Sequence, residues 1–482
     1  MGYRTKSLRP VFLAGWSCIA FVAVWQIQTQ AKDSVLALSA GLLLLASLTL
    51  SRYILGLAFT TGPMLYLVVF GLFHLGLVVP WALGVYDVGR VSWFVPYGLA
   101  SAIGLIIYAI LAYQLGLIVV LGGERDGEKR SNDDGEKLED PEMYFAGTLL
   151  FVSAAVMFVA GLIRLDPTGY YRLTYSDMFR LRAESDPRLF GSGITIALIG
   201  LSLAVAGAAK ERIRTIFVCA CLWILMLFYM GFRGPALIAG LIVYTVALRK
   251  GISFPRWLPW LAATLVLVAI PIMRNAREDP LNERSFTMSL KEFNILDGPA
   301  EMGATIRPLV ETEALIGAMN YRYGKTYLTG LKGVAPNLAL RWEASATESI
   351  EDLPPSHWLI AVVDPWTYRN NGGMGFSAVA EPYMNFGIAG VLAYFFLIAF
   401  LLTRLERISV HSSYALASWA LIIGPLLWTT RNDFANFFRP AIWGLLCLGL
   451  IRVLSAGYTL TSRAKGARQL RIRSRATETG QL

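Results

Sequence analysis

Residues 372–390 read GGMGFSAVAEPYMNFGIAG and join a long polar segment to a run of apolar residues. The polar segment, residues 274–380, contains no apolar run long enough to cross a bilayer, whereas most of the remaining chain consists of such runs. A water-facing loop that enters a hydrophobic bundle through a carboxylate, an amide and several arginines is where chemistry is expected. This pattern predicts a membrane-embedded helical bundle with one large outer loop.

The composition supports an integral membrane protein without a nucleic-acid partner. Of the 482 residues, 55% are hydrophobic and only 16% are charged, which is far more apolar than a soluble domain of this size. The formal net charge is +10. Many of the basic residues lie at the ends of apolar runs or in the C-terminal tail, as positive-inside topology and anionic lipid headgroups require.

Hydropathy predicts an all-α polytopic membrane protein with about twelve transmembrane helices and both chain ends in the cytoplasm. The predicted divisions are residues 1–273 with helices one to nine, a loop outside over 274–380, helices ten to twelve over 381–456, and a basic cytoplasmic tail over 457–482. A charge-dense segment near residues 122–142 is expected to be a disordered cytoplasmic connector.

Three expectations concern individual helices. The third span is expected to run from about residue 62 to residue 83, and the tenth to begin near residue 385. In the outer loop, Asp297 followed by Pro299 and Glu301 is typical of a helix start, and residues 300–319 have the pattern of an amphipathic helix.

Arginine is common in the loops predicted to lie outside, against the positive-inside rule. A guanidinium stays charged and offers a planar fork of donors, which suits phosphate and pyrophosphate oxygens better than an ammonium does. The alternative is pairing with acidic loop residues or lipid phosphates. In GFRGP, glycines on both sides of the arginine would let a ligand or partner approach closely. The predicted pyrophosphate-binding residues are Arg233, Arg274, Arg431 and Arg439 at the span mouths, with Arg277 and Arg307 in the loop.

The residue types of metal catalysis are missing from the sequence. The three histidines are scattered and no zinc or nucleotide motif is present, so we expect no metal and no cofactor. A carboxylate set against apolar sequence could act as a general base. Glu381, just before Pro382 at the lip of the tenth span, is the first candidate, followed by Glu301 and Asp433. The alternative for Glu381 is an ion pair with a mouth arginine.

Aromatic and polar residues near these carboxylates are candidates for substrate binding. Tyrosine rings of the loop could stack on the apolar C–H faces of sugars, or could instead be interfacial anchors. The predicted substrate-binding residues are Asn385, Tyr383, Tyr323, Tyr327 and Arg322.

Several segments of the second half of the chain carry a resemblance to a known family. They are GFRG at 231–234, AEMGATIRP at 300–308, YGKTYLTGL at 323–331 followed by Pro336, GFSAVAEPYMNFGIAG at 375–390, and RNDFANFFRP at 431–440. With these segments and its hydropathy profile, the chain resembles the Wzy family of bacterial oligosaccharide repeat-unit polymerases. The first half matches only as a run of helices.

The resemblance implies a fold, a reaction and partners. The fold would be a bundle like that of the C-type membrane glycosyltransferases in the bacterial inner membrane, with its site facing outwards. It would polymerise oligosaccharide repeat units carried on undecaprenyl pyrophosphate into O-antigen, capsule or exopolysaccharide, in a pathway that also holds a flippase and a chain-length regulator. The alternatives are an O-antigen ligase that transfers glycan to lipid A core, and a lipid-linked sugar flippase or transporter. For a transporter, charges at mid-depth of the spans would be expected.

Overall fold

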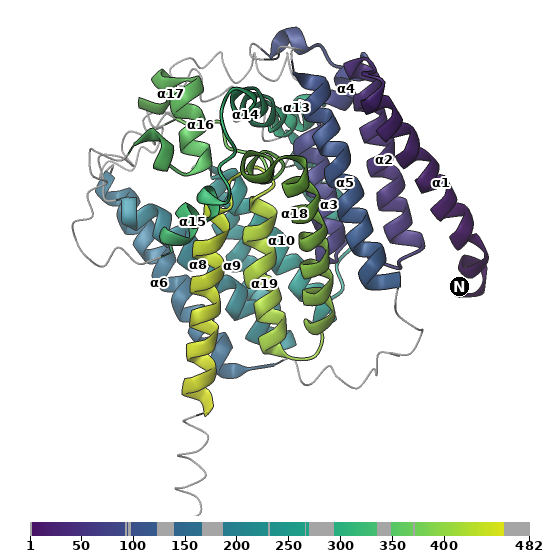
Figure 1. Ribbon diagram of the computed structural model, residues 1–482. Coiled ribbons are helices and arrows are strands. Elements are labelled where there is room, and N and C mark those ends of the chain that lie inside the picture. The colour runs from purple at the N-terminus through teal and green to yellow at the C-terminus, as the bar shows by residue number, and fades with distance from the viewer. Residues whose placement is uncertain are drawn as a thin grey trace, which may run out of the picture.

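The computed structural model describes residues 2–91, 94, 98–122, 139–165, 187–229, 232–265, 267–268, 294–334, 349–369 and 372–456. Over these ranges every regular element is a helix, and none is a strand. Long helices lie side by side in a bundle, and short helices of the predicted outer loop gather at one of its ends (Figure 1). The predicted all-α polytopic fold is confirmed.

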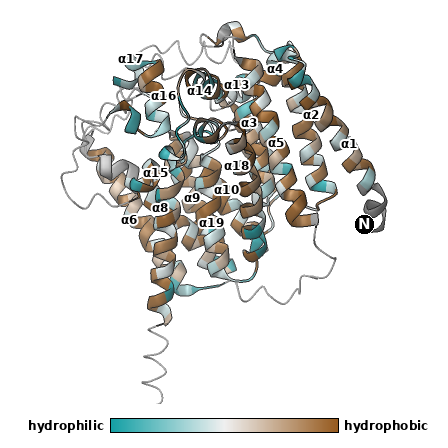
Figure 2. Cartoon of the chain, in the orientation of Figure 1, coloured by the Kyte–Doolittle hydropathy of each residue, from teal (hydrophilic) through white to brown (hydrophobic). Residues whose placement is uncertain are grey.

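The bundle helices follow the hydropathy of the sequence. Their bounds are α1 (Gly2–Gln28), α2 (Asp33–Tyr53), α3 (Gly62–Leu75), α4 (Val78–Ala82), α5 (Leu99–Gly122), α6 (Pro141–Leu165), α8 (Pro187–Gly207), α9 (Lys210–Tyr229), α10 (Arg233–Arg249), α18 (Ala380–Ile408), α19 (Ser413–Trp428) and a last helix, Ala435–Ala456. Hydrophobic residues run along these helices in Figure 2.

Length and composition separate these helices into two groups. Among the described residues, six are long and apolar enough to cross a membrane, namely α1, α2, α5, α6, α18 and the last helix. Four shorter apolar helices, in the 10–17 residue class, lie in α3, α8, α10 and α19. The chain is therefore a multi-pass membrane protein, and the number of twelve crossings stays a prediction. Residues 123–138 of the predicted connector, and the tail from 457, lie outside the described residues.

The third predicted span differs from the expectation, because its helix ends at Leu75 and a short second helix begins at Val78. Pro80 has no N–H to donate to the carbonyl of Gly76, and its ring would clash with that carbonyl in a continuous helix. The break is used for packing. A Cβ added to Gly76 would lie 2.5 Å from the carbonyl oxygen of Pro299, so a loop helix rests directly on this point.

The loop end of the bundle is built from α13 (Asp297–Gly303), α14 (Ile306–Ala318), α15 (Lys325–Lys332), η3 (Ile350–Asp352), α16 (Pro355–Val363) and α17 (Pro365–Arg369). The predicted helix start at Asp297 is confirmed. A single helix over 300–319 is wrong, because the chain turns at Ala304 and Thr305. Pro308 explains the turn, since in a continuous helix it would clash with the carbonyl of Ala304, but in the first turn of α14 its missing N–H costs nothing.

Helix α18 lies at the centre of the packing. It runs along α5, and it also contacts α3, α14, α15 and α19. Its first residues therefore meet both the loop helices and the bundle.

At the other end of α18, a half-buried ion pair links four helices. Arg249 Nη2 donates to both carboxylate oxygens of Glu406 at 2.8 Å, and its Nη1 donates to Ser409 Oγ at 2.7 Å. Trp419 Nε1 and the backbone N–H of Gly62 also donate to Glu406, at 3.1 and 2.9 Å. Since its hydrogen bonds satisfy both charges, this group stabilises the end of the bundle away from the loop helices.

Candidate functional site

The sequence NFG at residues 385–387 breaks α18 soon after it begins. Phe386 has φ −141° and ψ 15°, and Gly387 has φ 64° and ψ −151°. That combination at residue 387 is open to glycine and strained for other residues. A Cβ there would also lie 2.9 Å from the hydroxyl of Tyr321. The glycine at 387 therefore permits the helix break, which lies against the segment that precedes α15.

Backbone hydrogen bonds fasten this segment to the broken helix. The N–H groups of Arg322 and Tyr323 donate to the carbonyls of Met384 and Asn385, at 3.0 and 3.1 Å. Helix breaks expose carbonyl groups that need donors. Residues 322–323 supply those donors, and this contact sets the position of α15 over the start of α18.

A buried polar cluster forms beneath this contact. Asn385 accepts a hydrogen bond from the N–H of Gly324 at 2.8 Å and donates to Thr326 Oγ1 and to the carbonyl of Glu381, at 2.7 and 2.8 Å. Thr326 Oγ1 donates to Glu381 Oε1 at 2.9 Å, and the N–H of Phe434 donates to Glu381 Oε2 at 2.6 Å. We call Glu381, Asn385, Thr326 and the Phe434 N–H the Glu381 cluster.

The carboxylate of Glu381 is almost closed off from solvent, with 3% of its surface exposed. Among the described residues it forms no ion pair, and its two hydrogen-bond donors are neutral. The alternative of an ion pair with a mouth arginine is therefore not supported for the arginines that the structure describes. A carboxylate has about four lone-pair sites, so two remain for a further donor.

Asp433 lies beside the Glu381 cluster and has structural partners. Its Oδ2 accepts from the backbone N–H and the hydroxyl of Ser356, at 3.0 and 2.5 Å, and its Oδ1 accepts from Asn436 Nδ2 at 2.7 Å. Ser356 is in the first turn of α16, whose N–H groups have no partner within the helix. Asp433 therefore caps α16 from a segment far away in the sequence. The structure brings this candidate close to Glu381 through the adjacent Phe434.

Glu301, the second candidate base, lies on a different part of the loop end. It is half-buried on α13, which packs against α3 and α4.

The predicted tyrosines surround the cluster at different depths. Tyr327 packs edge-on against Phe434, with ring centres 5.7 Å apart. Burial, and then the Glu381 carboxylate, raise the pKa of Tyr327 well above its usual value, so the phenol stays protonated. Tyr383 packs edge-on against Tyr321 at 6.2 Å. Tyr321 and Tyr323 are 41% and 75% exposed, so their rings remain available to a ligand.

The predicted pyrophosphate-binding arginines that the structure describes have different partners. The Arg431 guanidinium lies 5.8 Å from the ring centre of Phe73 on α3. Arg439 instead donates from Nε and Nη2 to the carbonyl of Gly333, just after α15, at 2.9 and 2.7 Å. Arg307 lies 3.7 Å from Glu311, its neighbour one turn further along α14. The side chain of Arg233, and the whole of Arg274 and Arg277, lie outside the described residues.

Gly234 in GFRGP lies against an aromatic ring of the protein itself. A Cβ on Gly234 would lie 1.4 Å from the ring of Trp428 on α19. The room beside this residue is thus taken up by packing between α10 and α19, so at Gly234 the close approach is made by a ring of the protein itself.

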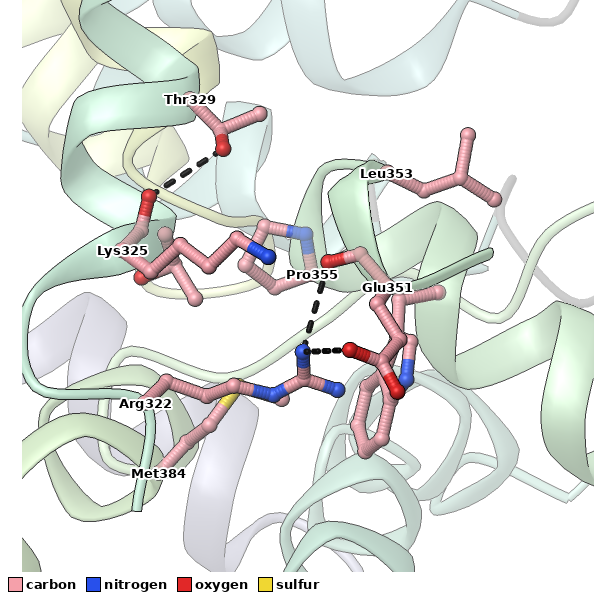
Figure 3. A pocket seen from close by; sticks show the side chains of 9 residues that line it. Arg322, Lys325, Thr329, Glu351, Leu353, Pro355 and Met384 are labelled. Atoms are coloured by element: carbon pink, nitrogen blue, oxygen red, sulfur yellow. Dashed lines mark hydrogen bonds and ion pairs between the residues drawn. The ribbon is translucent and has the colours of Figure 1, made fainter. Parts of the chain in front are cut away.

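A pocket opens next to the Glu381 cluster and shares Thr326 with it (Figure 3). Arg322 enters it from the segment bound to the α18 break, and its guanidinium lies 5.1 Å from the ring centre of Trp358. The lining residues are Arg322, Lys325, Thr326, Thr329, Glu351, Leu353, Pro355, Trp358 and Met384.

Sequence reasoning missed several residues that build this site. Thr326, although it lies in the YGKTYLTGL segment, and Ser356 were not predicted as site residues, and their contacts join segments 55 and 77 residues apart. Ser377 is another example, because its hydroxyl links the N–H of Val379, near the start of α18, to His74 Nε2 at 2.9 Å. The one sequence signal for this part of the site was the glycine at the turn before α15. Gly324 has φ 86°, and its N–H donates to Asn385.

No group of three or more histidine, cysteine, aspartate or glutamate side chains suited to hold a metal ion occurs in the described ranges. A reaction without a metal stays a prediction.

Comparison with known proteins gives a clear family signal. The model of the family described as O-antigen polysaccharide polymerase Wzy matches residues 11–459. The protein named Protein CapE of Staphylococcus aureus is 24% identical over 251 residues, which is 52% of this chain and 52% of that protein. The match thus spans about half the length of this relative. No solved structure gives a significant match.

Proposed function

Because the chain belongs to the O-antigen polysaccharide polymerase Wzy family, we propose that it polymerises oligosaccharide repeat units into a surface polysaccharide on the outer face of a bacterial inner membrane. The donor in this proposal is a growing glycan on undecaprenyl pyrophosphate, and the acceptor is one lipid-linked repeat unit. A flippase that supplies the repeat units and a chain-length regulator would be its partners in the membrane.

The observation that carries the proposal is the extent of the family match, from residue 11 to residue 459. It includes the bundle helices, the Glu381 cluster and the pocket. A match over the helices alone would support only a membrane protein, whereas this one also includes the polar groups at the loop end.

In the proposed reaction, a hydroxyl oxygen of the acceptor sugar attacks the anomeric carbon of the donor glycan. The bond from that carbon to the pyrophosphate oxygen breaks, and the leaving pyrophosphate takes the electron pair. Glu381 accepts the hydroxyl proton as the new bond forms, which is general base catalysis. Its two unused lone-pair sites are where the acceptor hydroxyl would donate.

Because Glu381 is only 3% exposed, the acceptor hydroxyl must gain entry past the residues that cover it. Thr326 is the residue that lies between the carboxylate and the pocket. The proposal therefore requires a shift at the beginning of α15 when substrate binds.

Charge on the leaving pyrophosphate would be stabilised by arginine, since a guanidinium fork matches phosphate oxygens. Arg233, Arg274, Arg431 and Arg439 remain the proposed residues, with Arg277 and Arg307 as further candidates. An Arg→Lys replacement keeps the charge and removes the fork, so polymer synthesis should fall at the sites that bind pyrophosphate. Parent-like synthesis in all four mouth variants would refute this assignment.

Lipid extracts of a strain that lacks this protein test the overall function. Loss of a polymerase should leave single repeat units on undecaprenyl pyrophosphate at the outer face of the membrane. Loss of an O-antigen ligase should instead leave long polymer on the lipid carrier, and loss of a flippase should leave single units at the cytoplasmic face. Either of these last two results would replace the polymerase proposal.

The variant Glu381→Gln tests the proposed base. An amide can still accept from the Phe434 N–H and donate to Thr326, but it cannot take a proton, so membrane levels should stay normal while synthesis falls by about a hundredfold or more. Glu313→Gln, which removes a half-buried carboxylate elsewhere at the loop end, is the control. Long polymer from Glu381→Gln would exclude Glu381 as the base.

A further inference from the structure

Arg322 is a buried cation with an unused donor. Its side chain is only 10% exposed, and its Nη2 is buried without a hydrogen-bond partner. Its Nη1 donates to the backbone carbonyl of Glu351 at 3.3 Å and lies 4.0 Å from that residue's carboxylate. A buried guanidinium N–H without an acceptor is costly, and it indicates that an acceptor oxygen belongs in the pocket.

A second cation of the same pocket has a replaceable partner. Lys325 is 47% exposed and pairs with Asp352, which is 50% exposed, at 2.9 Å. Glu351, the neighbour of Asp352 in η3, is 64% exposed. One short turn therefore supplies the acidic groups for both cations. Figure 3 shows the contact of Glu351 with Arg322. Exposed ion pairs of this kind contribute little free energy, so an incoming anion can displace them.

We propose that this pocket is a binding subsite for an oxyanion of the lipid-linked glycan, held by Arg322 and Lys325, with the acidic turn Glu351–Asp352 as an internal competitor. The source that fits best is the carboxylate of an acidic sugar. The identity of the ligand as a glycan rests on the proposed function, whereas the anion site itself rests on the geometry of the pocket.

Charge and surroundings favour a carboxylate. Two cations face two acidic side chains, so a singly charged ligand needs to displace only the weaker contact, that of Glu351 with Arg322. The exposed rings of Tyr321 and Tyr323 flank Arg322 in the sequence, where they could contact the apolar face of the same sugar. A phosphate of the lipid carrier shares the oxyanion chemistry and is the other source.

The position of the subsite connects it to the reaction. Thr326 lines the pocket and also donates to Glu381. A sugar held by its carboxylate in the pocket would therefore lie directly across Thr326 from the proposed base. This arrangement makes the pocket a determinant of specificity for acidic repeat units.

Binding of small probes to the purified full chain in detergent tests the subsite. The probes are methyl glucuronide, methyl glucoside and inorganic pyrophosphate, followed by saturation-transfer NMR at low salt. We expect the glucuronide to bind at least about tenfold more tightly than the neutral glucoside, because a charge-assisted bond to a guanidinium is strong. Arg322→Gln should remove this preference.

Glu351→Gln is the decisive variant, because it removes the competing acid and should tighten glucuronide binding by about twofold to tenfold. A misfolded protein could not give this gain. Lys332→Gln makes the same change of charge as Arg322→Gln, but at the end of α15, away from the pocket lining, and should leave binding unchanged.

Each outcome decides the proposal. Pyrophosphate binding that needs Arg322, without glucuronide binding, would keep the oxyanion site and assign it to the lipid carrier. Absence of binding by both anions, or no gain in Glu351→Gln, would overturn it. Because these probes are measured without polymer synthesis, such a failure leaves the polymerase proposal standing, and a failed polymerase test leaves the anion site standing.

Discussion

Replacing Asp433 separates a structural role from a chemical role for this buried carboxylate. Asp433 is fully buried and accepts three hydrogen bonds, two of them from Ser356 at the start of α16. If it acts as the cap of α16, its loss should lower stability first. If it acts on substrate, its loss should lower synthesis without affecting stability.

The expected magnitude follows from these contacts. In Asp433→Asn, the amide oxygen can keep both Ser356 bonds, which change from charge-assisted to neutral at a cost of about 1 kcal/mol each. The third bond can be retained, because Asn436 is exposed and its amide can turn to present its oxygen. The total is about 2 kcal/mol. In Asp433→Ala all three donors lose their acceptor, and we expect about 4 kcal/mol.

Thermal unfolding of the detergent-purified chain, followed by the fluorescence of its 13 tryptophans, compares the stabilities of the parent and the two variants. The parent should unfold at the highest temperature, Asp433→Asn below it and Asp433→Ala lowest, while Asp433→Asn keeps polymer synthesis within about tenfold of the parent. Asp364→Asn is the matched control. Asp364 caps the short α17 by accepting from Thr367, and asparagine is an equally good cap there.

Two results would refute this reasoning. An Asp433→Asn protein that unfolds like the parent but loses about a hundredfold in synthesis would make Asp433 part of the chemistry. An Asp433→Ala protein with parent-like unfolding would show that its hydrogen bonds do not stabilise α16.

Three further changes test the packing around the site. Gly387→Ala should destabilise the protein by about 1–3 kcal/mol, since it combines a strained backbone with a contact to the hydroxyl of Tyr321, and a parent-like unfolding temperature would contradict this. Gly234→Ala should lower the unfolding temperature, because its methyl group would clash with the ring of Trp428. Adding Trp428→Leu to the Gly234→Ala chain should restore part of that loss. If the double variant instead shows the sum of the two single-variant losses, the contact is excluded. Burial, and then the nearby carboxylate, raise the pKa of Tyr327, so its phenol stays protonated. Tyr327→Phe should therefore leave the alkaline limb of the pH profile of polymer synthesis unchanged. A shifted alkaline limb would show that this phenol ionises.

Local sequence determines the helices of this protein, and the exceptions have local causes as well. Apolar runs predict the bundle because backbone groups in lipid must be hydrogen-bonded within the segment. Pro80 and Pro308 explain why two expected helices are broken, and the rule that proline interrupts a helix was available in advance. NFG at 385–387 lies in one of the segments that carry the family resemblance, although its conformation as a helix break was not predicted.

The sequence by itself placed a glutamate, an asparagine and arginines near the lip of one span, because charged and polar residues beside apolar runs stand out in one dimension. Only the tertiary structure decided which of them meet. It joined Glu381 to Thr326 and Phe434, assigned Asp433 to the start of α16, and turned Arg322, rather than Arg431 or Arg439, into the pocket. These contacts link segments far apart in the chain, and their geometry depends on how helices pack, which no local pattern encodes.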